Sequence, residues 1–414
     1  MTTDQHRPSR RSPVEPETLG KYGRKAVFAS SIGYALDGFD LLILSFALGG
    51  IMADLHLSTP QAGSLATITL LGAVTGGFVF GLLSDRFGRV RMLTWSVIVF
   101  AVFTGLSALA FGFWDLALYR FIAGIGIGGE FGIGMTLAAE AVPARLRARA
   151  TSYVGVGFQL GVLAAALASP WIIGAFGWRG LFVVGAFPAM FAVVLRKRLH
   201  ESPKFLEKKA ELNSRPSPVR LLLADRRTIR ITVAIVVLTT VQNFGYFGIM
   251  TWLPSYLSNQ FGYGLTKSSM WTAATVLGML AGVVLFGHLA DRIGRRRTFW
   301  IFQLSAAASV LVYSQLSSPW ALLIGGAVMG ACANGMIGGY GALMAELYPT
   351  EARATAQNVL FNIGRGLGGL APVLIALVAS ANGFPFALGL LSGIYVLAFC
   401  AMFVIPERRG AELA

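Results

Sequence analysis

A nine-residue signature occurs twice in this chain at one fixed offset. Gly81-Leu-Leu-Ser-Asp-Arg-Phe-Gly-Arg89 returns 206 positions later as Gly287-His-Leu-Ala-Asp-Arg-Ile-Gly-Arg295. The same offset relates residues outside the signature: Trp114 and Trp320, Glu140 and Glu346, Pro143 and Pro349, Arg147 and Arg353, and Glu201 and Glu407. A repeat of this length is too long for the unit of a solenoid. It predicts two related halves, with function at the interface between them.

Long apolar stretches fill both halves. Hydrophobic residues make up 55% of the chain and charged residues only 13%, and the mean hydropathy is +0.66. Soluble domains carry about 25% charged residues, and about 20 apolar residues cross a bilayer as a helix. We expect an all-α membrane protein with twelve transmembrane helices in two six-helix bundles related by a pseudo-two-fold axis. The expected spans are 27–52, 62–84, 92–112, 115–139, 150–173, 180–198, 228–257, 268–290, 298–316, 319–344, 355–380 and 384–405.

The distribution of basic residues predicts the orientation. The net charge is +15, and 30 of the 34 Lys and Arg residues lie in the two tails and in alternate loops. By the positive-inside rule both termini are cytoplasmic, in a multi-pass protein of the bacterial inner membrane. The basicity therefore reports topology and does not indicate nucleic-acid binding. The expected segments are a cytoplasmic tail (1–26), a bundle (27–198), a cytoplasmic linker (199–227), a second bundle (228–405) and a cytoplasmic tail (406–414).

Charged residues recur at the cytoplasmic ends of helices in both halves. We expect them to form ion pairs between helices that close a cytoplasmic gate and exchange partners as the two halves move. The alternative is that they only fix the topology. In the first half these residues are Asp85, Arg86, Arg89, Glu140 and Arg147, and in the second half Asp291, Arg292, Arg295, Glu346 and Arg353.

Three acidic residues lie inside apolar spans. Asp37 and Asp40 are three residues apart, hence on one helical face. Two carboxylates so placed in a low dielectric repel each other, so one of them should hold a proton near neutral pH. That is the property a proton-coupling site needs; the alternative is that either aspartate braces a neighbouring helix. Glu130, in the fourth span, is a candidate either for carrying a proton or for pairing with another helix.

Two arginines also lie inside apolar spans. Arg365 shares a helical face with Asn358 and Asn362, and a polar stripe on an apolar helix predicts a cavity. A guanidinium matches a carboxylate in bidentate geometry, so we expect Arg365 to anchor a substrate carboxylate unless it pairs with a fixed acid. Arg120 is a second candidate, which could instead snorkel to the headgroups. Further candidate substrate contacts are Gln159, Gln242, Asn243, Tyr246, Asn334, Tyr340 and Asn362.

The chain resembles the major facilitator superfamily over nearly its full length, on the two copies of Gly-x-x-x-Asp-Arg-x-Gly-Arg between matching spans. The resemblance implies two six-helix bundles around a central cavity and transport by alternating access. Leu36-Asp37-Gly38-Phe39-Asp40 looks like the Asp-Gly-x-Asp element of the organic-acid proton symporters, in the aromatic-acid and the sialate or monocarboxylate branches. Arg120 and the glycines after it are similar to their fourth helix, which implies functional roles for Asp37, Asp40 and Arg120.

Together these features predict a secondary active transporter that imports a small aromatic or aliphatic carboxylate by proton symport. Importing a monoanion against an inside-negative potential costs about 2.3 kcal/mol per 100 mV, and one proton cancels that charge. We expect no cofactor besides the coupling proton, no metal, and an organic anion and membrane lipid as partners of a functional monomer. The alternatives are a proton-coupled exporter of drugs or cations and a porter of neutral solutes such as sugars. No nucleophile and base pair indicates an enzyme.

Overall fold

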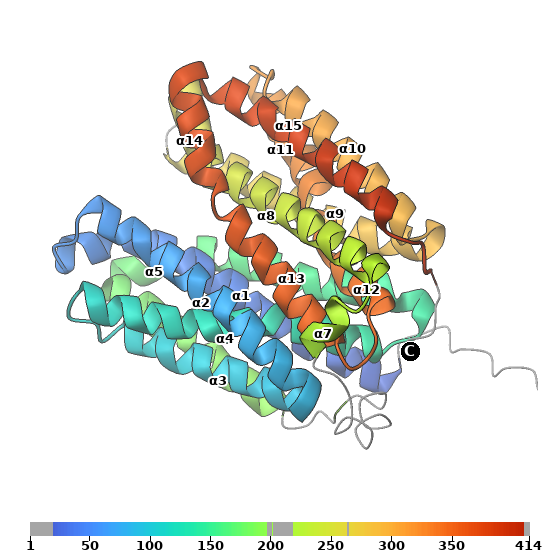
Figure 1. Cartoon of the computed structure of the whole chain (residues 1–414). Coiled ribbons are helices and arrows are strands. Elements are labelled where there is room, and N and C mark those ends of the chain that lie inside the picture. Colours follow the sequence, from blue (N-terminus) through green and yellow to red (C-terminus); the bar gives the residue numbers. More distant parts are fainter. Residues whose placement is uncertain (1–19, 197–200, 202–217, 263–264, 410–414) are drawn as a thin grey trace, which may run out of the picture.

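The structure is a computed structural model of the chain that describes residues 20–196, 201, 218–262 and 265–409, and within these ranges its regular elements are all helical (Figure 1). The amino-terminal half contains α1 (Lys21–Asp54), α2 (Thr59–Phe87), α3 (Arg89–Ser107), α4 (Phe113–Glu140) and α5 (Arg147–Arg196). The short α7 (Pro218–Leu222) precedes the carboxy-terminal half. That half contains α8 (Arg226–Phe261), α9 (Leu265–Ile293), α10 (Arg295–Tyr313), α11 (Pro319–Asn334), α12 (Ile337–Leu347), α13 (Arg353–Gly368), α14 (Ala371–Asn382) and α15 (Phe384–Ala401).

These elements account for the twelve expected spans. The spans expected at 150–173 and 180–198 run together as α5, which changes direction at Gly177, where φ is 64°. The spans expected at 319–344 and 355–380 are each divided, at Gly335 between α11 and α12 and at Gly369 between α13 and α14. In the described ranges ten helices are long and apolar enough to cross a membrane, besides the shorter apolar segment Trp171–Phe187. The chain is therefore an all-helical, multi-pass membrane protein.

Two of the expected segment boundaries fall inside helices, the one between 26 and 27 in α1 and the one between 227 and 228 in α8. The first helix begins at Lys21, within the segment expected as a tail (1–26), of which residues 1–19 lie outside the described part. Of the expected linker 199–227, the described end forms α7 and the first residues of α8, whereas 199–200 and 202–217 lie outside the described residues. The last five residues of the expected tail 406–414 are also outside them.

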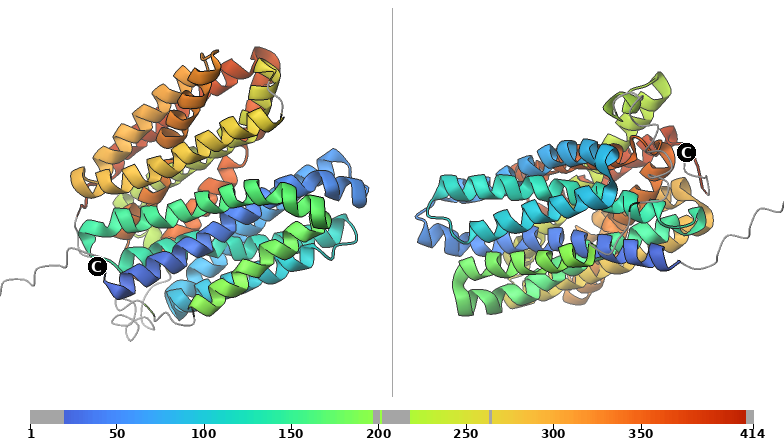
Figure 2. Two further views of the ribbon diagram at one scale, coloured as in Figure 1. Left: turned by 180° about the vertical axis from the view of Figure 1, so that it is seen from behind. Right: turned by 90° about the horizontal axis from the view of Figure 1, so that it is seen from below.

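The helices assemble into two halves (Figure 2). In the first, α1 packs on α5, and α2 and α3 pack on α4; in the second, α9 packs on α11, α8 on α13 and α10 on α15. The halves meet where α5 contacts α9 and α12, and where α13 contacts α2 and α4. The ribbons converge at the end that carries the turns at Gly88 and Gly294, here called the motif end, and spread apart toward the opposite, far end (Figures 1 and 2). Both described chain ends lie at the motif end.

Glycines allow the closest helix contacts in the first half. A Cβ atom on Gly124 would lie 2.2 Å from the carbonyl oxygen of Thr69, and one on Gly128 would lie 2.0 Å from that of Ala73. Both distances are shorter than any real contact, so α4 can approach α2 this closely only with glycine at these positions. This is the packing that small residues at a spacing of four produce in membranes.

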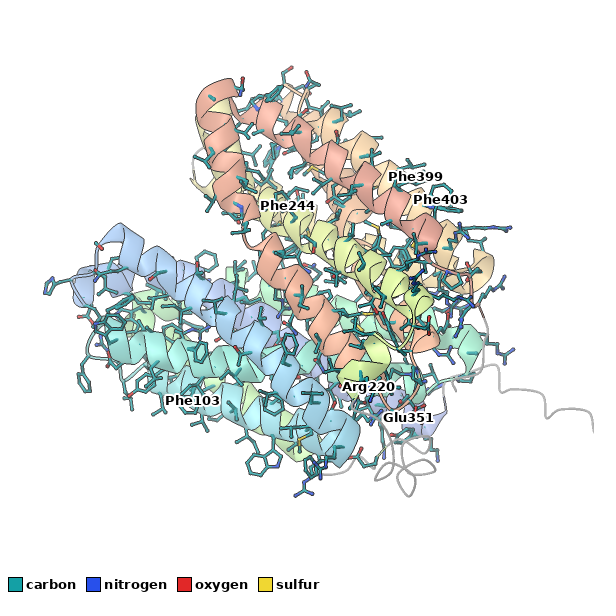
Figure 3. The ribbon with its side chains drawn as sticks, in the orientation of Figure 1. Phe103, Arg220, Phe244, Glu351, Phe399 and Phe403 are labelled. Atoms are coloured by element: carbon teal, nitrogen blue, oxygen red, sulfur yellow. The ribbon has the colours of Figure 1, made fainter. Side chains whose placement is uncertain are left out.

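The outside of both halves is apolar. Large hydrophobic side chains remain exposed there, among them Trp95 at 51%, Leu285 at 59% and Phe403 at 56%. Figure 3 shows Phe103 on the outer side of α3, and Phe399 and Phe403 on the outer side at the end of α15. Large exposed apolar surfaces mark contact with another apolar phase. In this chain that phase is the lipid hydrocarbon surrounding the bundle.

Candidate functional site

A small pocket lies between the two halves. In this conformation the volume open to the centre of a water-sized sphere is about 10 Å³. The repeat predicted a site at this interface, and both halves contribute to the lining. The lining residues are Tyr34 and Leu41 on α1, Phe158 on α5, Gln242, Asn243, Tyr246 and Phe247 on α8, Asn334 on α11, Ile337 on α12 and Arg365 on α13.

Several lining residues of the pocket lie next to breaks in the helices. Asn334 is the last residue of α11 and Ile337 the first of α12, while Arg365 lies in the last turn of α13. In the first half the counterpart helix α4 runs without a break from Phe113 to Glu140. Breaks inside membrane helices occur where the chain lines a cavity, and they are typical of substrate sites. The carboxy-terminal half therefore supplies most of the polar groups.

Arg365 is the cation of the pocket. Its side chain is only 2% exposed, and its Nη1 has no hydrogen-bond partner in the described part of the chain. The guanidinium carbon lies 5.5 Å from the centre of the Phe361 ring. Tyr34, across the pocket on α1, is close enough to interact electrostatically with both Arg365 and Asp37. A buried charged donor with an unmade hydrogen bond is costly, and an anionic ligand would supply the missing acceptor.

The other lining groups are amides and aromatic rings. Gln242 Nε2 donates to Asn334 Oδ1 at 2.8 Å, and Asn243 Nδ2 donates to the carbonyl oxygen of Thr239 at 2.9 Å. On the opposite side the ring centres of Tyr34 and Phe158 are 4.8 Å apart. Phe158 in turn lies 6.0 Å from Tyr246, so an aromatic contact joins the two halves. The pocket thus combines one cation, three amides and an aromatic wall.

Asp40 and Arg120 form a separate pair within the first half. Arg120 Nη1 donates to Asp40 Oδ1 at 3.0 Å and Nη2 donates to Oδ2 at 2.5 Å, with both side chains fully buried. Thr104 donates to Asp40 Oδ1 at 3.1 Å, and Arg120 Nε donates to Thr69 Oγ1 at 3.3 Å. In this conformation neither residue lines the pocket, and the alternative that Arg120 snorkels to the headgroups is wrong. Their roles in proton coupling and substrate binding stay predictions.

Four other candidates do not line the pocket. Ser96 Oγ donates to Glu130 Oε1 at 2.9 Å, which links α3 to α4. Asn362 Nδ2 donates to the carbonyl oxygen of Gly128 at 2.9 Å, and Tyr340 donates to that of Leu238 at 2.9 Å. Gln159 is fully buried, with no hydrogen bond to its amide within the described residues. The structure thus uses Asn362 and Tyr340 to join helices and does not bring them to the pocket.

Part of the pocket was missed by the sequence analysis. Tyr34, Leu41, Phe158, Phe247 and Ile337 line it but were not candidates. A signal existed for the first two, because Tyr34 lies three residues before Asp37 and Leu41 four residues after it, on the same helical face. The aromatic and aliphatic members resemble the apolar residues around them. Sequence alone does not separate an apolar pocket wall from ordinary packing.

Crossed ion pairs join the halves at the motif end. Arg147 Nη1 lies 2.8 Å from Glu346 Oε1, linking the start of α5 to α12. Arg353 Nη1 lies 2.7 Å from Glu140 Oε1, linking the start of α13 to α4. The two contacts are related by the repeat offset, with the halves exchanged. Each pair is almost completely buried, so both halves are held together at this end.

The aspartates of the signature bind helix N-termini of the opposite half. Asp85 accepts hydrogen bonds from the backbone nitrogens of Ala354 (3.3 Å) and Thr355 (2.7 Å) at the start of α13. Asp291 accepts from those of Ala148 (3.2 Å) and Arg149 (3.0 Å) at the start of α5. A helix N-terminus favours a carboxylate through its free N–H groups and its dipole. These contacts complete an interlock that is repeated across the two halves.

The signature arginines divide into two groups. Arg89 lies 3.0 Å from Asp85 and 3.6 Å from Glu140. In the copy, Arg295 lies 3.0 Å from Asp291 and 2.9 Å from Glu346. By contrast, Arg86 and Arg292 are exposed and lie outside the interlock, which corrects their assignment to the gate. Gly88 and Gly294, whose φ angles are 112° and 102°, form the turns immediately before α3 and α10, and the exposed arginines precede these turns.

Comparisons with known proteins agree with this architecture. A model of the Major Facilitator Superfamily matches residues 30–278 and 261–413. The chain is 58% identical over 402 residues to a putative metabolite transport protein of Haemophilus influenzae, covering 95% of the chain and 99% of the relative. It is 30% identical over 388 residues to the sialic acid transporter of Escherichia coli, covering 92% and 93%. The solved proton:xylose symporter XylE has the same fold, with a TM-score of 0.80, 19% identity and coverage of 96% and 98%.

Proposed function

We propose that this chain, which belongs to the major facilitator superfamily and is a membrane transporter rather than an enzyme, imports a small organic carboxylate by proton symport. The observation that carries the proposal is Arg365, a buried cation in the pocket between the halves whose Nη1 has an unmade hydrogen bond. A carboxylate supplies both the counter-charge and the acceptor. The similarity to a sialic acid transporter supports an acid as the substrate.

The substrate body is aromatic or aliphatic in this proposal. Tyr34 and Phe158 form an aromatic wall on the side of the other half, and Tyr246 on α8 contacts Phe158. Such a wall removes apolar surface from water while the polar groups fix the orientation of the ligand. Arg365 also argues against the alternative of a cation exporter, because a buried guanidinium repels a cationic ligand at short range.

Proton coupling is assigned first to Asp37. Asp40 is already neutralised by its bidentate contact with Arg120, so protonating it would leave a buried arginine without its partner. Asp37 is fully buried on the pocket side of α1, near Tyr34. One proton bound there during import cancels the charge of a monoanion. Asp40 and Glu130 are the secondary candidates for the proton pathway.

We assign the motif end to the cytoplasmic side. Both described chain ends lie there, and so do the signature arginines beside the turns at Gly88 and Gly294, as the positive-inside rule requires of a protein in the bacterial inner membrane. The interlock then acts as a cytoplasmic gate that is closed in this conformation. Opening it breaks the crossed pairs Arg147–Glu346 and Arg353–Glu140 and releases Asp85 and Asp291 from their helices. The transport unit is a monomer, because one chain holds both halves.

The test uses purified protein in proteoliposomes. Aromatic, aliphatic and sugar acids are added one at a time, and the external pH is recorded. Alkalinisation with one class of acid, lost in Arg365→Ala and retained in the exposed-arginine control Arg292→Ala, is expected. No pH response to any acid contradicts proton symport of a carboxylate. Uptake of a neutral sugar that survives Arg365→Ala favours the neutral-solute alternative.

A further inference from the structure

Two amides of the pocket have hydrogen-bonding groups left over. Gln242 on α8 and Asn334 on α11 are each 1% exposed, and one hydrogen bond of 2.8 Å joins them. The remaining atoms, Gln242 Oε1 and Asn334 Nδ2, are buried and have no hydrogen-bond partner in the described part of the chain. Each of these residues lines the pocket. The pair therefore has one acceptor and one donor unused at the pocket.

This result does not depend on how the amides are oriented. A side-chain amide has one carbonyl oxygen and one NH₂ group, whose positions are inferred from the hydrogen-bond network. If both amides were turned over, Asn334 would donate to Gln242, and the pair would still leave one oxygen and one nitrogen unused. Buried polar groups are nearly always satisfied, and this pair lines the pocket, so a bound ligand can satisfy it with a group that both donates and accepts.

We propose that the transported acid carries a hydroxyl group that donates to the free amide oxygen and accepts from the free amide nitrogen of the Gln242–Asn334 pair. The substrate class is then a hydroxylated carboxylic acid. The inference rests on the proposed function, since the carboxylate of the same molecule binds Arg365, and it adds the second polar group that the substrate must have. A hydroxyl is the smallest group that is donor and acceptor together.

The placement of these groups gives the pocket its selectivity. Arg365, Gln242 and Asn334 belong to the carboxy-terminal half, whereas Tyr34 and Phe158 approach from the other half. An acid without a hydroxyl would bury the amide pair and leave its two groups unpaired. For this reason, a site built to bind a hydroxyl discriminates against the analogue that lacks one. The polar face therefore selects the substrate, and the aromatic face covers it.

The experiment compares matched acids by their dissociation constants for the purified full-length protein. The probes are benzoate against 2-, 3- and 4-hydroxybenzoate, and hexanoate against D-gluconate. At least one hydroxylated acid is expected to bind about three- to tenfold more tightly than its parent, which corresponds to one or two added neutral hydrogen bonds. The methoxybenzoate of the same position loses the advantage, because an ether oxygen accepts but does not donate. Parent acids that bind as tightly as every hydroxylated partner overturn the inference.

Variants connect the preference to the amide pair. In Gln242→Leu/Asn334→Leu the affinity ratio of hydroxylated to parent acid is expected to fall to about one. The matched control is Gln303→Leu, a fully buried amide on α10 outside the pocket, in which the ratio is retained. If the double variant does not fold, the inference is tested by comparing hydroxybenzoate with methoxybenzoate binding to the unchanged protein. Arg365-dependent binding without a hydroxyl preference contradicts only this inference, whereas absence of Arg365-dependent binding to any acid contradicts the proposed function as well.

Discussion

Arg120 and Arg365 are both buried arginines in apolar helices, but their surroundings differ. Arg120 meets a fixed carboxylate and a hydroxyl, and three of its nitrogens donate hydrogen bonds. Arg365 lines a pocket, and its Nη1 has no acceptor in the described chain. The same residue type thus braces one half and leaves a donor open in the other. A buried cation alone does not mark a binding site; an unmade hydrogen bond at a pocket between the halves does.

The largest expected effect is the loss of stability in Arg120→Leu. Removing one partner of a buried ion pair leaves the other charge uncompensated, at a cost of about 3–5 kcal/mol. The melting temperature of the purified protein should fall markedly, and adding Asp40→Asn should restore much of it because no lone charge remains. Equal melting temperatures for Arg120→Leu and Arg365→Leu would remove the distinction between the two arginines.

Arg365→Leu should spare stability and abolish transport. Losing two charge-assisted hydrogen bonds to a carboxylate lowers uptake at low substrate concentration by about 100-fold or more. Arg365→Lys keeps the charge but not the planar fork, so it should recover only part of the activity. The measurement is initial uptake into proteoliposomes beside the melting temperature of each variant. Normal uptake by Arg365→Leu would show that the carboxylate binds elsewhere.

Substitutions of the two aspartates of α1, Asp37 and Asp40, should likewise have different effects, one on transport and the other on stability. Asp37→Asn is expected to abolish uphill uptake while counterflow of substrate survives, since binding and exchange need no net proton movement. With one pH unit across the membrane, the accumulation ratio should fall about tenfold relative to the unchanged protein, because one unit corresponds to about 1.36 kcal/mol. Asp40→Asn should instead lower the melting temperature, because Arg120 loses its partner. Uphill uptake that persists in Asp37→Asn contradicts its assignment.

Two kinds of site residue could be predicted from the sequence. They are the residues that the repeat duplicates and the charged residues that lie inside apolar spans. The fixed offset identified Asp85, Glu140, Arg353 and their counterparts, since both halves place them at equivalent helix ends. The sequence also identified Arg365, because an arginine deep in an apolar helix has few structural roles. The same stripe argument extended to Asn362, which donates to a backbone carbonyl of α4 instead. This contact depends on how α13 packs against α4, and no single segment of the sequence reveals it.

The two helix breaks could not be predicted from the sequence either. The apolar pattern continues through Gly335 and Gly369, so the spans around them were expected to be continuous. Glycine is common throughout this chain, and most of its 50 glycines lie inside intact helices or at turns. What distinguishes the two breaks is their position beside the pocket, near Asn334 and Arg365. That position follows from the packing of the whole half and not from local propensity.

A third acid and arginine pair isolates the effect of burial. Asp54 ends α1 at the far end, beyond the candidate span Lys21–Leu44, and accepts hydrogen bonds from Arg179 and from Trp178 Nε1. The side chains of Arg179 and Asp54 are 41% and 47% exposed. The hydrogen bonds from Arg179 and Trp178 lower the pKa of Asp54 from its ordinary value of 3.8. The pair therefore has the chemistry of Asp40–Arg120 without its burial.

The smallest expected effect is that of Asp54→Asn. Because the pKa is lower in the folded state, the contribution is present above the unfolded value of 3.8 and is lost as the pH falls below it. At about pH 6 the melting temperature should fall by only about 1–2 °C, as for an exposed pair screened by water, and at about pH 3 the difference from the unchanged protein should shrink further. A loss as large as that in Arg120→Leu would mean that pairing itself, and not burial, sets the stability of this half. A small decrease in melting temperature that becomes smaller at acid pH would indicate that the two pairs differ because Asp40 is desolvated and Asp54 is not.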